Sequence, residues 1–291
     1  MKIARFEYRN AVLLGLVDTD RGTLDVIRTT TASRDPMIAL IEADLAGTRP
    51  QGCGETVPLA DVRLLPPIAQ PSKNILCVGK NYVAHAAEFT RSGYDGTAKS
   101  LTDPVPDAPI IFTKAPCSMV GAHDDVLPPW ALTAEVDYEA ELGVVIGRGG
   151  RSIASAEALA HVWGYTVIND VTARDLQVKH KQWLLGKSID TFCPIGPWLV
   201  TADEIDHANT GISCWVNGEL RQQANTRDMI FDIPAIIATI SASMSLAPGD
   251  IIATGTPAGV GVGFKPPKFL QRGDTVRIAI AGIGEISNRI A

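Results

Sequence analysis

Short apolar runs closed by Gly, Pro or Asp recur along most of the chain, and this pattern limits the folds that it can adopt. Such runs with turn residues at both ends are typical of β-strands. The 26 glycines and 19 prolines supply the turns and disfavour a helical bundle. The runs that we expect to form strands of the main body are Ile75–Val78, Ile110–Phe112, Ala140–Ile146, Tyr165–Ile168, Trp198–Val200, Ile212–Val216, Ile251–Ala253 and Val276–Ile280.

Helical patterns are fewer. The segments that we expect to be helical are Tyr82–Phe89, Ser155–His161, Ala173–His180 and Pro234–Met244. The last of them follows Asp232 and begins with Pro, which is favoured in the first turn of a helix. The sequence therefore predicts an α+β fold that is mostly β, with a few short helices.

A change of pattern divides the chain near residue 70. Two β-type runs, Lys2–Phe6 and Val12–Val17, and a short helical stretch, Pro36–Ile41, precede a connector with several prolines, Leu65–Pro71. Adjacent prolines disfavour both a helix and a central strand. We therefore expect a small N-terminal α/β domain at residues 1–70 and a larger catalytic domain at residues 71–291.

The charge balance excludes several kinds of partner. The chain carries 26 Lys and Arg residues against 32 Asp and Glu residues, a net charge of −6. This is the wrong sign for binding nucleic acid or an anionic membrane surface. The long uncharged run at 233–249 is interrupted by prolines and is shorter than the roughly 20 apolar residues that span a bilayer. We expect no nucleic-acid partner and no membrane, and a small-molecule substrate.

The cysteines and the N-terminus bear on the compartment. Five cysteines without a C-x-x-C pair argue against a disulfide framework, and we expect them to be small buried side chains. Charges interrupt the apolar runs at the N-terminus, so no signal-peptide core is visible. We expect the mature chain to begin at Met1 and the location to be cytoplasmic.

The segment 137–141, DYEAE, places acidic residues beside an apolar run. In a strand, Glu139 and Glu141 would share one face. Paired carboxylates in an interior are costly unless one binds a proton or a cation lies between them. A third carboxylate, Asp170, ends the β-type run 164–170. Three hard oxygen ligands without thiolates suit Mg²⁺ or Mn²⁺.

The alternation by itself leaves a second interpretation open. A D-x-E-x-E pattern is also the solvated face of an amphipathic antiparallel strand. Asp137 falls on the same face, so the spacing does not identify which two residues are ligands.

Five ordered segments carry a more specific signal: VGKNYVAHAAE at 78–88, DYEAEL at 137–142, NDVTARDLQ at 169–177, GKSIDT at 186–191 and TGTPAGVG at 254–261. Over residues 73 to about 285, the chain resembles the fumarylacetoacetate hydrolase (FAH) family. The resemblance implies the family's mixed β-roll core, with the first 70 residues as the small extension of bacterial members. It also implies a homodimer, and one Mg²⁺ or Mn²⁺ ion per chain held by Glu139, Glu141 and Asp170.

His85 and Glu88 lie three positions apart, which places them on one face of a helix. The carboxylate can orient the imidazole and favour its protonated form, so that the His takes a proton from water as a general base. A surface His beside an acidic residue is the alternative. In the family, this pair is thought to activate water when a mobile segment closes. We expect residues 90–102 to form such a lid, from which Arg91 would reach a distal substrate carboxylate.

The remaining motif residues take roles from the resemblance. Lys187 would stabilise an oxyanion, Gln177 would hydrogen-bond the substrate, and Thr256 would contact a substrate carboxylate. Arg174 and Asp175 are interpreted as a structural ion pair. Trp183 is equally compatible with the pocket wall and with the core. The other histidines, which show no ligand spacing, are expected to be structural or solvated: His123, His161, His180 and His207.

These assignments predict a metal-dependent catabolic hydrolase that cleaves a C–C bond in an acylpyruvate-like or 2,4-diketo acid. The substrate would be a small anionic 2-oxo acid. The same metal site serves other reactions within the family, so oxaloacetate decarboxylation, isomerisation or hydration of a hydroxymuconate-type acid remains the alternative. A catalytically silent binding protein on this fold is a further alternative.

Overall fold

The computed structural model describes residues 1–28, 35–97 and 102–291, and strands dominate it. In chain order the strands are β1 Lys2–Tyr8, β2 Ala11–Asp18, β3 Thr23–Ile27, β4 Thr56–Pro58, β5 Arg63–Leu64, β6 Ile75–Gly79, β7 Ile110–Lys114, β8 Met119–Val120, β9 Val136–Asp137, β10 Ala140–Ile146, β11 Val162–Asn169, β12 Thr172–Ala173, β13 Cys193–Thr201, β14 Gly211–Val216, β15 Glu219–Asn225, β16 Ile251–Ala253, β17 Thr275–Ile280 and β18 Gly284–Arg289. The predicted mostly-β class is confirmed, and every run predicted as a strand of the main body lies within a strand.

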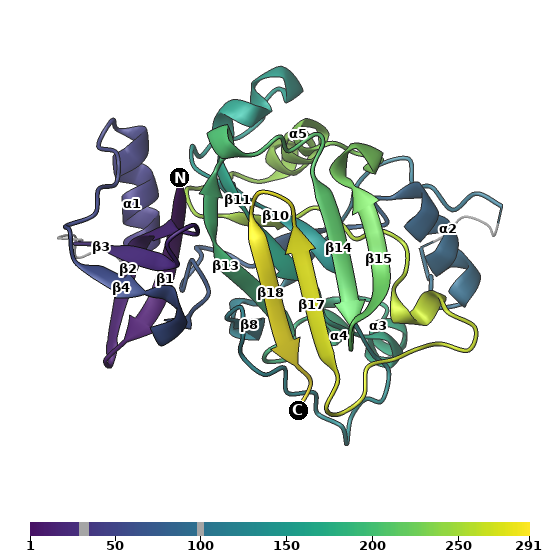
Figure 1. The fold of residues 1–291 in the computed structure, drawn as a ribbon. Coiled ribbons are helices and arrows are strands. Elements are labelled where there is room, and N and C mark those ends of the chain that lie inside the picture. The colour runs from purple at the N-terminus through teal and green to yellow at the C-terminus, as the bar shows by residue number, and fades with distance from the viewer. Residues whose placement is uncertain (29–34, 98–101) are drawn as a thin grey trace.

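One large mixed sheet organises the molecule, with the path β4-β3-β2-β1-β13-β11-β10-β16-β6-β7. A four-stranded sheet, β15-β14-β17-β18, packs beside it (Figure 1). Every residue of β10, β11 and β13 is buried, so these strands form the centre of the core. Strands buried on both faces read as continuous apolar runs, which is why the sequence marks them clearly.

The N-terminal residues join this sheet directly. β1 pairs antiparallel with β13, with Lys2 opposite Val200 and Ile3 opposite Leu199. In Figure 1 the N-terminal strands and their helix lie on the left of the molecule, against β13. The main sheet therefore runs across the expected boundary at residue 70, and the division into two domains stays a prediction.

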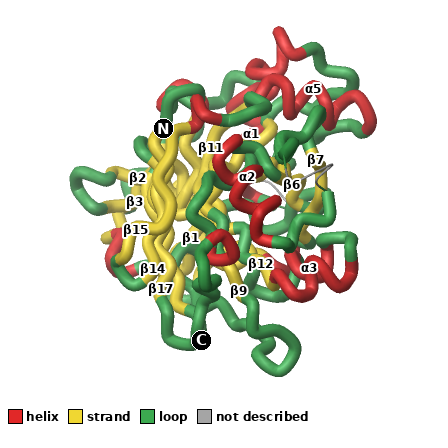
Figure 2. The backbone as a smooth tube through the Cα atoms, turned by 90° about the vertical axis from the view of Figure 1, so that its right-hand side faces the viewer, coloured by secondary structure: helices red, strands yellow, loops and turns green. Residues whose placement is uncertain are grey.

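The helices are short and lie around the strands. They are α1 Pro36–Leu45, α2 Val83–Ser92, α3 Arg174–His180, α4 Leu184–Lys187 and α5 Ile233–Ser243. Residues 155–161, predicted as a helix, form a 3-10 helix instead. The helix α2, at the right of Figure 1, faces the viewer in Figure 2, with α3 beside it.

Two cysteines depart from the expected burial. Cys53 and Cys117 are exposed, whereas Cys77, Cys193 and Cys214 are buried. The buried three lie in strands, and the exposed two lie in a loop and in a short 3-10 turn. Within the described residues, no helix combines the length and the apolar character needed to cross a membrane.

The side chain of Asp35 ties α1 to the connector that follows the N-terminal strands. Its Oδ1 accepts from the N–H groups of Met37 and Ile38, which caps α1. Its Oδ2 accepts from the N–H groups of Ala69 at 2.7 Å and Gln70 at 2.9 Å. One buried carboxylate thus fixes two segments that are far apart in sequence.

We predict that Asp35→Ala lowers the free energy of unfolding by about 2 kcal/mol or more, because a helix cap and buried backbone donors lose their acceptor together. Urea unfolding monitored by circular dichroism measures this change. Asp20→Ala, at an exposed turn, is the matched control. Equal stability of the two variants would contradict the prediction.

Candidate active site

Strand pairing brings three carboxylates together in the core. β10 and β11 pair antiparallel with Ala140 opposite Asn169, so the start of one strand meets the end of the other. The N–H of Asp170 donates to the carbonyl oxygen of Glu139 at 2.9 Å. One carboxylate oxygen each from Glu139, Glu141 and Asp170 lies within 4.8 Å of the others, and all three residues are buried. Glu139 itself lies just before β10, not within it.

Cationic side chains surround two of these carboxylates. Lys187 Nζ lies 2.8 Å from Glu139 Oε2 and 2.8 Å from Asp170 Oδ2. Arg174 Nη2 lies 2.7 Å from Glu139 Oε1, and Lys114 Nζ lies 2.7 Å from Asp170 Oδ1. Lys114 also donates to the carbonyl oxygens of Val171 and Lys187, which holds it behind the site.

Glu141 is different, because the structure gives it no ion pair with any described residue. Its Oε2 accepts from the N–H of Gly255 at 2.8 Å. Burial, followed by the charges of Asp170 and Glu139, raises the pKa of Glu141 well above its usual value. Glu139 shows the opposite direction: burial would raise its pKa, but Lys187 and Arg174 outweigh this and lower it to about 2.

The donor set fits a hard divalent cation. Three carboxylates converge with no sulfur ligand among them, and one of them lacks a cationic partner in the described part of the chain. The cluster contains the carboxylates of Asp137, Glu139, Glu141 and Asp170 and the cations of Lys114, Arg174 and Lys187. With Glu141 ionised, as binding of a cation requires, four negative and three positive groups leave one negative charge, which a divalent ion would reverse to one positive charge. The site would then attract an anionic substrate.

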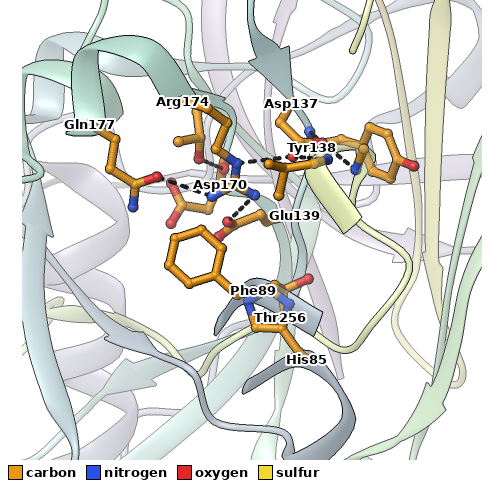
Figure 3. Close-up of polar contacts among 12 residues, drawn as sticks. His85, Phe89, Asp137, Tyr138, Glu139, Asp170, Arg174, Gln177 and Thr256 are labelled. Carbon is orange, nitrogen blue, oxygen red and sulfur yellow. Dashed lines mark hydrogen bonds and ion pairs between the residues drawn. The ribbon is translucent and has the colours of Figure 1, made fainter. Parts of the chain in front are cut away.

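The expectation of a structural ion pair between Arg174 and Asp175 is wrong, because Arg174 pairs with other carboxylates. Its guanidinium lies 2.9 Å from Asp137 Oδ2 and 2.7 Å from Glu139, and it donates to Gln177 Oε1 at 3.2 Å (Figure 3). Asp175 instead accepts from the Thr133 hydroxyl at 2.7 Å. Neighbouring residues at the start of α3 point in different directions around the helix, so adjacency in sequence does not pair them.

His85 and Glu88 lie on one face of α2, as their spacing predicts. His85 is 4% exposed and stacks on Phe89, with ring centroids 5.9 Å apart. Its Nδ1 lies 3.5 Å from Glu88 Oε2, longer than an ordinary hydrogen bond, and this buried nitrogen has no hydrogen-bond partner among the residues that the structure describes. Both Glu88 oxygens accept from the N–H of Gly259 at 3.1 Å. The pair is close but not hydrogen-bonded.

A small pocket connects these groups. Its lining includes most of the predicted site residues: His85, Glu139, Glu141, Gln177, Lys187 and Thr256. The wall also contains Trp183, which packs on Gly79 so closely that a Cβ at residue 79 would lie 2.7 Å from the ring. Trp183 therefore belongs to the pocket wall.

The structure does not bring Arg91 into this pocket. Arg91 is exposed and lines a separate hollow with Glu88 and Lys265. It lies six residues after His85, which places it on another face of the helix. The expected lid, residues 90–102, is described only in part, since residues 98–101 lie outside the described residues.

Two lysines of the site were missed. Lys114 is the buried last residue of β7. The signal that could have identified it in the sequence is a lysine at the end of an apolar strand. Lys80 lines the pocket, and its Nζ lies 2.7 Å from Asp95 Oδ2. The other four histidines do not line the pocket.

The family model "Fumarylacetoacetate (FAA) hydrolase C-terminal" matches residues 74–291, and "Rv2993c-like, N-terminal" matches residues 1–67. The chain is 50% identical over 233 residues to oxaloacetate tautomerase YisK of Bacillus subtilis (strain 168), covering 80% of this chain and 74% of that one. It is 48% identical over 238 residues to the mitochondrial oxaloacetate tautomerase FAHD2A of Homo sapiens, covering 80% and 71%.

Two solved structures match this chain over its whole length. Fumarylacetoacetate hydrolase from psychrophilic Exiguobacterium antarcticum superposes with a TM-score of 0.85 at 40% identity, covering 100% of this chain and 99% of that one. Maleylpyruvate hydrolase from Sphingobium sp. SYK-6, in complex with manganese (II) ion and pyruvate, gives a TM-score of 0.77 at 34% identity, with the same coverage.

We predict that Glu141→Gln abolishes the stabilisation by Mn²⁺ without lowering the stability of the metal-free protein. Because the folded state raises the pKa of Glu141, its ionised form costs stability as the pH rises above the usual Glu value. At about pH 8, the metal-free variant should therefore melt at or above the wild-type temperature, while the stabilisation by Mn²⁺ is lost. Calorimetric melting tests both parts, with the exposed Glu157→Gln as control. Full Mn²⁺ stabilisation of the Glu141 variant would contradict the site.

We also predict that the wild-type affinity for Mn²⁺ rises with pH. A proton held on Glu141 must leave before the carboxylate can bind a cation, so metal binding releases protons at acidic pH. Titration calorimetry in two buffers with different ionisation enthalpies measures this release. An affinity that is constant between about pH 5.5 and 8 would argue against the assignment.

Proposed function

The chain belongs to the fumarylacetoacetate hydrolase family, and from this premise we propose that it is a divalent-metal enzyme that interconverts the keto and enol forms of a small 2-oxo dicarboxylic acid such as oxaloacetate. The observation that carries the proposal is the shared pocket, which is lined by the buried imidazole of His85, the buried ammonium of Lys187 and the carboxylates of Glu139 and Glu141. Curated relatives at 50% and 48% identity with this activity support it.

Tautomerisation needs one proton to leave C3 and one proton to reach the oxygen on C2. His85 is the group proposed to take the C3 proton, and the electron pair of the broken C–H bond forms the C2–C3 double bond. The protonated His85 then returns this proton to the C2 oxygen and becomes neutral again, so atoms and charge balance. A base and an adjacent positive charge are the whole requirement, and no water has to be activated.

Lys187 is suited to stabilise charge on the C2 oxygen. Burial would lower the pKa of Lys187, but Asp170 and Glu139 outweigh it and hold the pKa above its usual value. The side chain is therefore an ammonium at neutral pH, and it acts as a donor and not as a base. Mg²⁺ or Mn²⁺ held by the three carboxylates would add positive charge beside the same oxygen.

Gln177 and Thr256 are proposed to bind the substrate carboxylates. The Oε1 of Gln177 accepts from Arg174, which leaves the amide N–H groups of Gln177 to face the pocket. The Oγ1 of Thr256 accepts from Gln222 Nε2 at 2.8 Å, which leaves its hydroxyl hydrogen to donate. Both side chains therefore present donors to an anion.

C–C bond hydrolysis of an acylpyruvate-like acid, the leading hypothesis from sequence, is the second candidate. The proximity of His85 and Glu88 favours it, because such a pair can activate water, and a maleylpyruvate hydrolase is among the structural relatives. Decarboxylation of oxaloacetate would use the same groups. The homodimer and the cytoplasmic location also remain predictions.

We predict that His85→Gln lowers kcat/KM for oxaloacetate tautomerisation by about 100-fold or more, the usual contribution of a general base. The decay of the enol's ultraviolet absorbance in Mn²⁺ buffer measures the rate. The affinity for Mn²⁺ should stay within about two-fold of wild type, because His85 is not a proposed ligand. His123→Gln, at an exposed position, is the control. Unchanged turnover in the His85 variant would show that His85 is not the base.

A panel of acylpyruvates in heavy-oxygen water separates the two candidates. Hydrolysis places the label in a new carboxylate and yields two acids, whereas tautomerisation yields one acid of unchanged mass apart from exchange at the ketone. We expect enol–keto interconversion of oxaloacetate to be at least ten-fold more efficient than any C–C cleavage. Faster cleavage with label in the new acid would make hydrolysis the function.

A further inference from the structure

One loop, residues 254–263, donates backbone hydrogen bonds to three carboxylates that come from different elements. The N–H of Gly255 reaches Glu141, and the N–H of Gly259 reaches Glu88. The N–H groups of Gly261 and Val262 reach Asp137 at 2.6 and 3.0 Å. The loop therefore holds a proposed metal ligand and the partner of the proposed base at the same time.

Gly263, at the end of this loop, makes room for the Glu88 carboxylate. A Cβ at residue 263 would lie 2.2 Å from Cδ and Oε1 of Glu88 and 2.4 Å from its Cγ, so the two cannot coexist. The backbone of Gly263 does not adopt a positive φ. Space alone, and not backbone conformation, requires glycine here.

A hollow beside Glu88 has room for its side chain in a displaced position. This hollow is lined by Ala84, Ala87, Arg91 and Lys265. Both cations would attract a carboxylate that was pushed away from Gly259. Because the side chain of Glu88 is flexible, adding a methyl group at residue 263 would displace Glu88 and leave the fold in place.

We propose that Gly263 is a positioning residue of the active site, whose lack of a side chain keeps the Glu88 carboxylate on Gly259 and beside His85. The inference rests on the proposed function in one respect, since it takes His85 as the base. It assigns to Gly263 no contact with substrate or metal. Its effect passes through Glu88 alone.

The experiment compares Gly263→Ala with Gly211→Ala, a glycine where an added Cβ would meet nothing closer than 4.0 Å. We expect Gly263→Ala to lower kcat about ten-fold or more while the affinity for Mn²⁺ and the melting temperature match those of Gly211→Ala. A crystal structure of Gly263→Ala should show the Glu88 carboxylate turned away from the N–H of Gly259.

A rescue variant distinguishes positioning from general damage. Glu88→Asp shortens the side chain, so alone it should lower kcat, whereas in the Gly263→Ala background it should leave kcat unchanged or raise it. Such non-additivity supports the proposal. Additive losses, a loss of Mn²⁺ affinity in Gly263→Ala, or wild-type kcat in that variant would overturn it.

The crystallographic readout keeps this test separate from the proposed function. If the wild-type enzyme tautomerises no 2-oxo acid, the proposed reaction fails, and the position of Glu88 in Gly263→Ala still decides the inference. A carboxylate that stays on Gly259 would overturn it, and a displaced carboxylate would support it.

Discussion

The burial of three carboxylates at one point of the core is the constraint on which the rest of the structure depends. Like charges without water repel strongly, and such a group persists only with cations or protons to balance it. Lys114, Arg174 and Lys187 supply part of that balance, and Glu141 is left without an ion-pair partner among the described residues. The remaining charge is the physical reason to place a divalent cation there.

The fold builds this site from rigid parts and adjusts it with a loop. The pairing of β10 with β11 sets the carboxylates within reach of one another, and buried strands allow little movement. The proposed base, His85, and its neighbour Glu88 come from α2, outside the sheet. The glycine-rich loop at 254–263 donates hydrogen bonds to both Glu141 and Glu88, so the relative position of the proposed metal site and the proposed base depends on its backbone.

The sequence predicts the buried strands well, because fully buried strands leave continuous apolar runs. Its local motifs also mark residues that the fold brings into one pocket. It fails where partners are decided by tertiary packing. Arg174 pairs with Asp137 and Glu139 across the fold, not with its neighbour Asp175. Arg91 lies outside the pocket because it falls on a different face of α2 from His85. The strand β15, with sequence ELRQQAN, was not predicted because it is a polar edge strand without an apolar run.

The central claim is that the carboxylates of Glu139, Glu141 and Asp170 bind a divalent cation. Anomalous diffraction from crystals soaked in Mn²⁺ tests it most directly, because it locates the ion without reference to any reaction. We predict one strong peak among the three carboxylates, within about 2.0–2.5 Å of an oxygen of each. No peak there, with Lys187 Nζ still bridging Glu139 and Asp170, would contradict it.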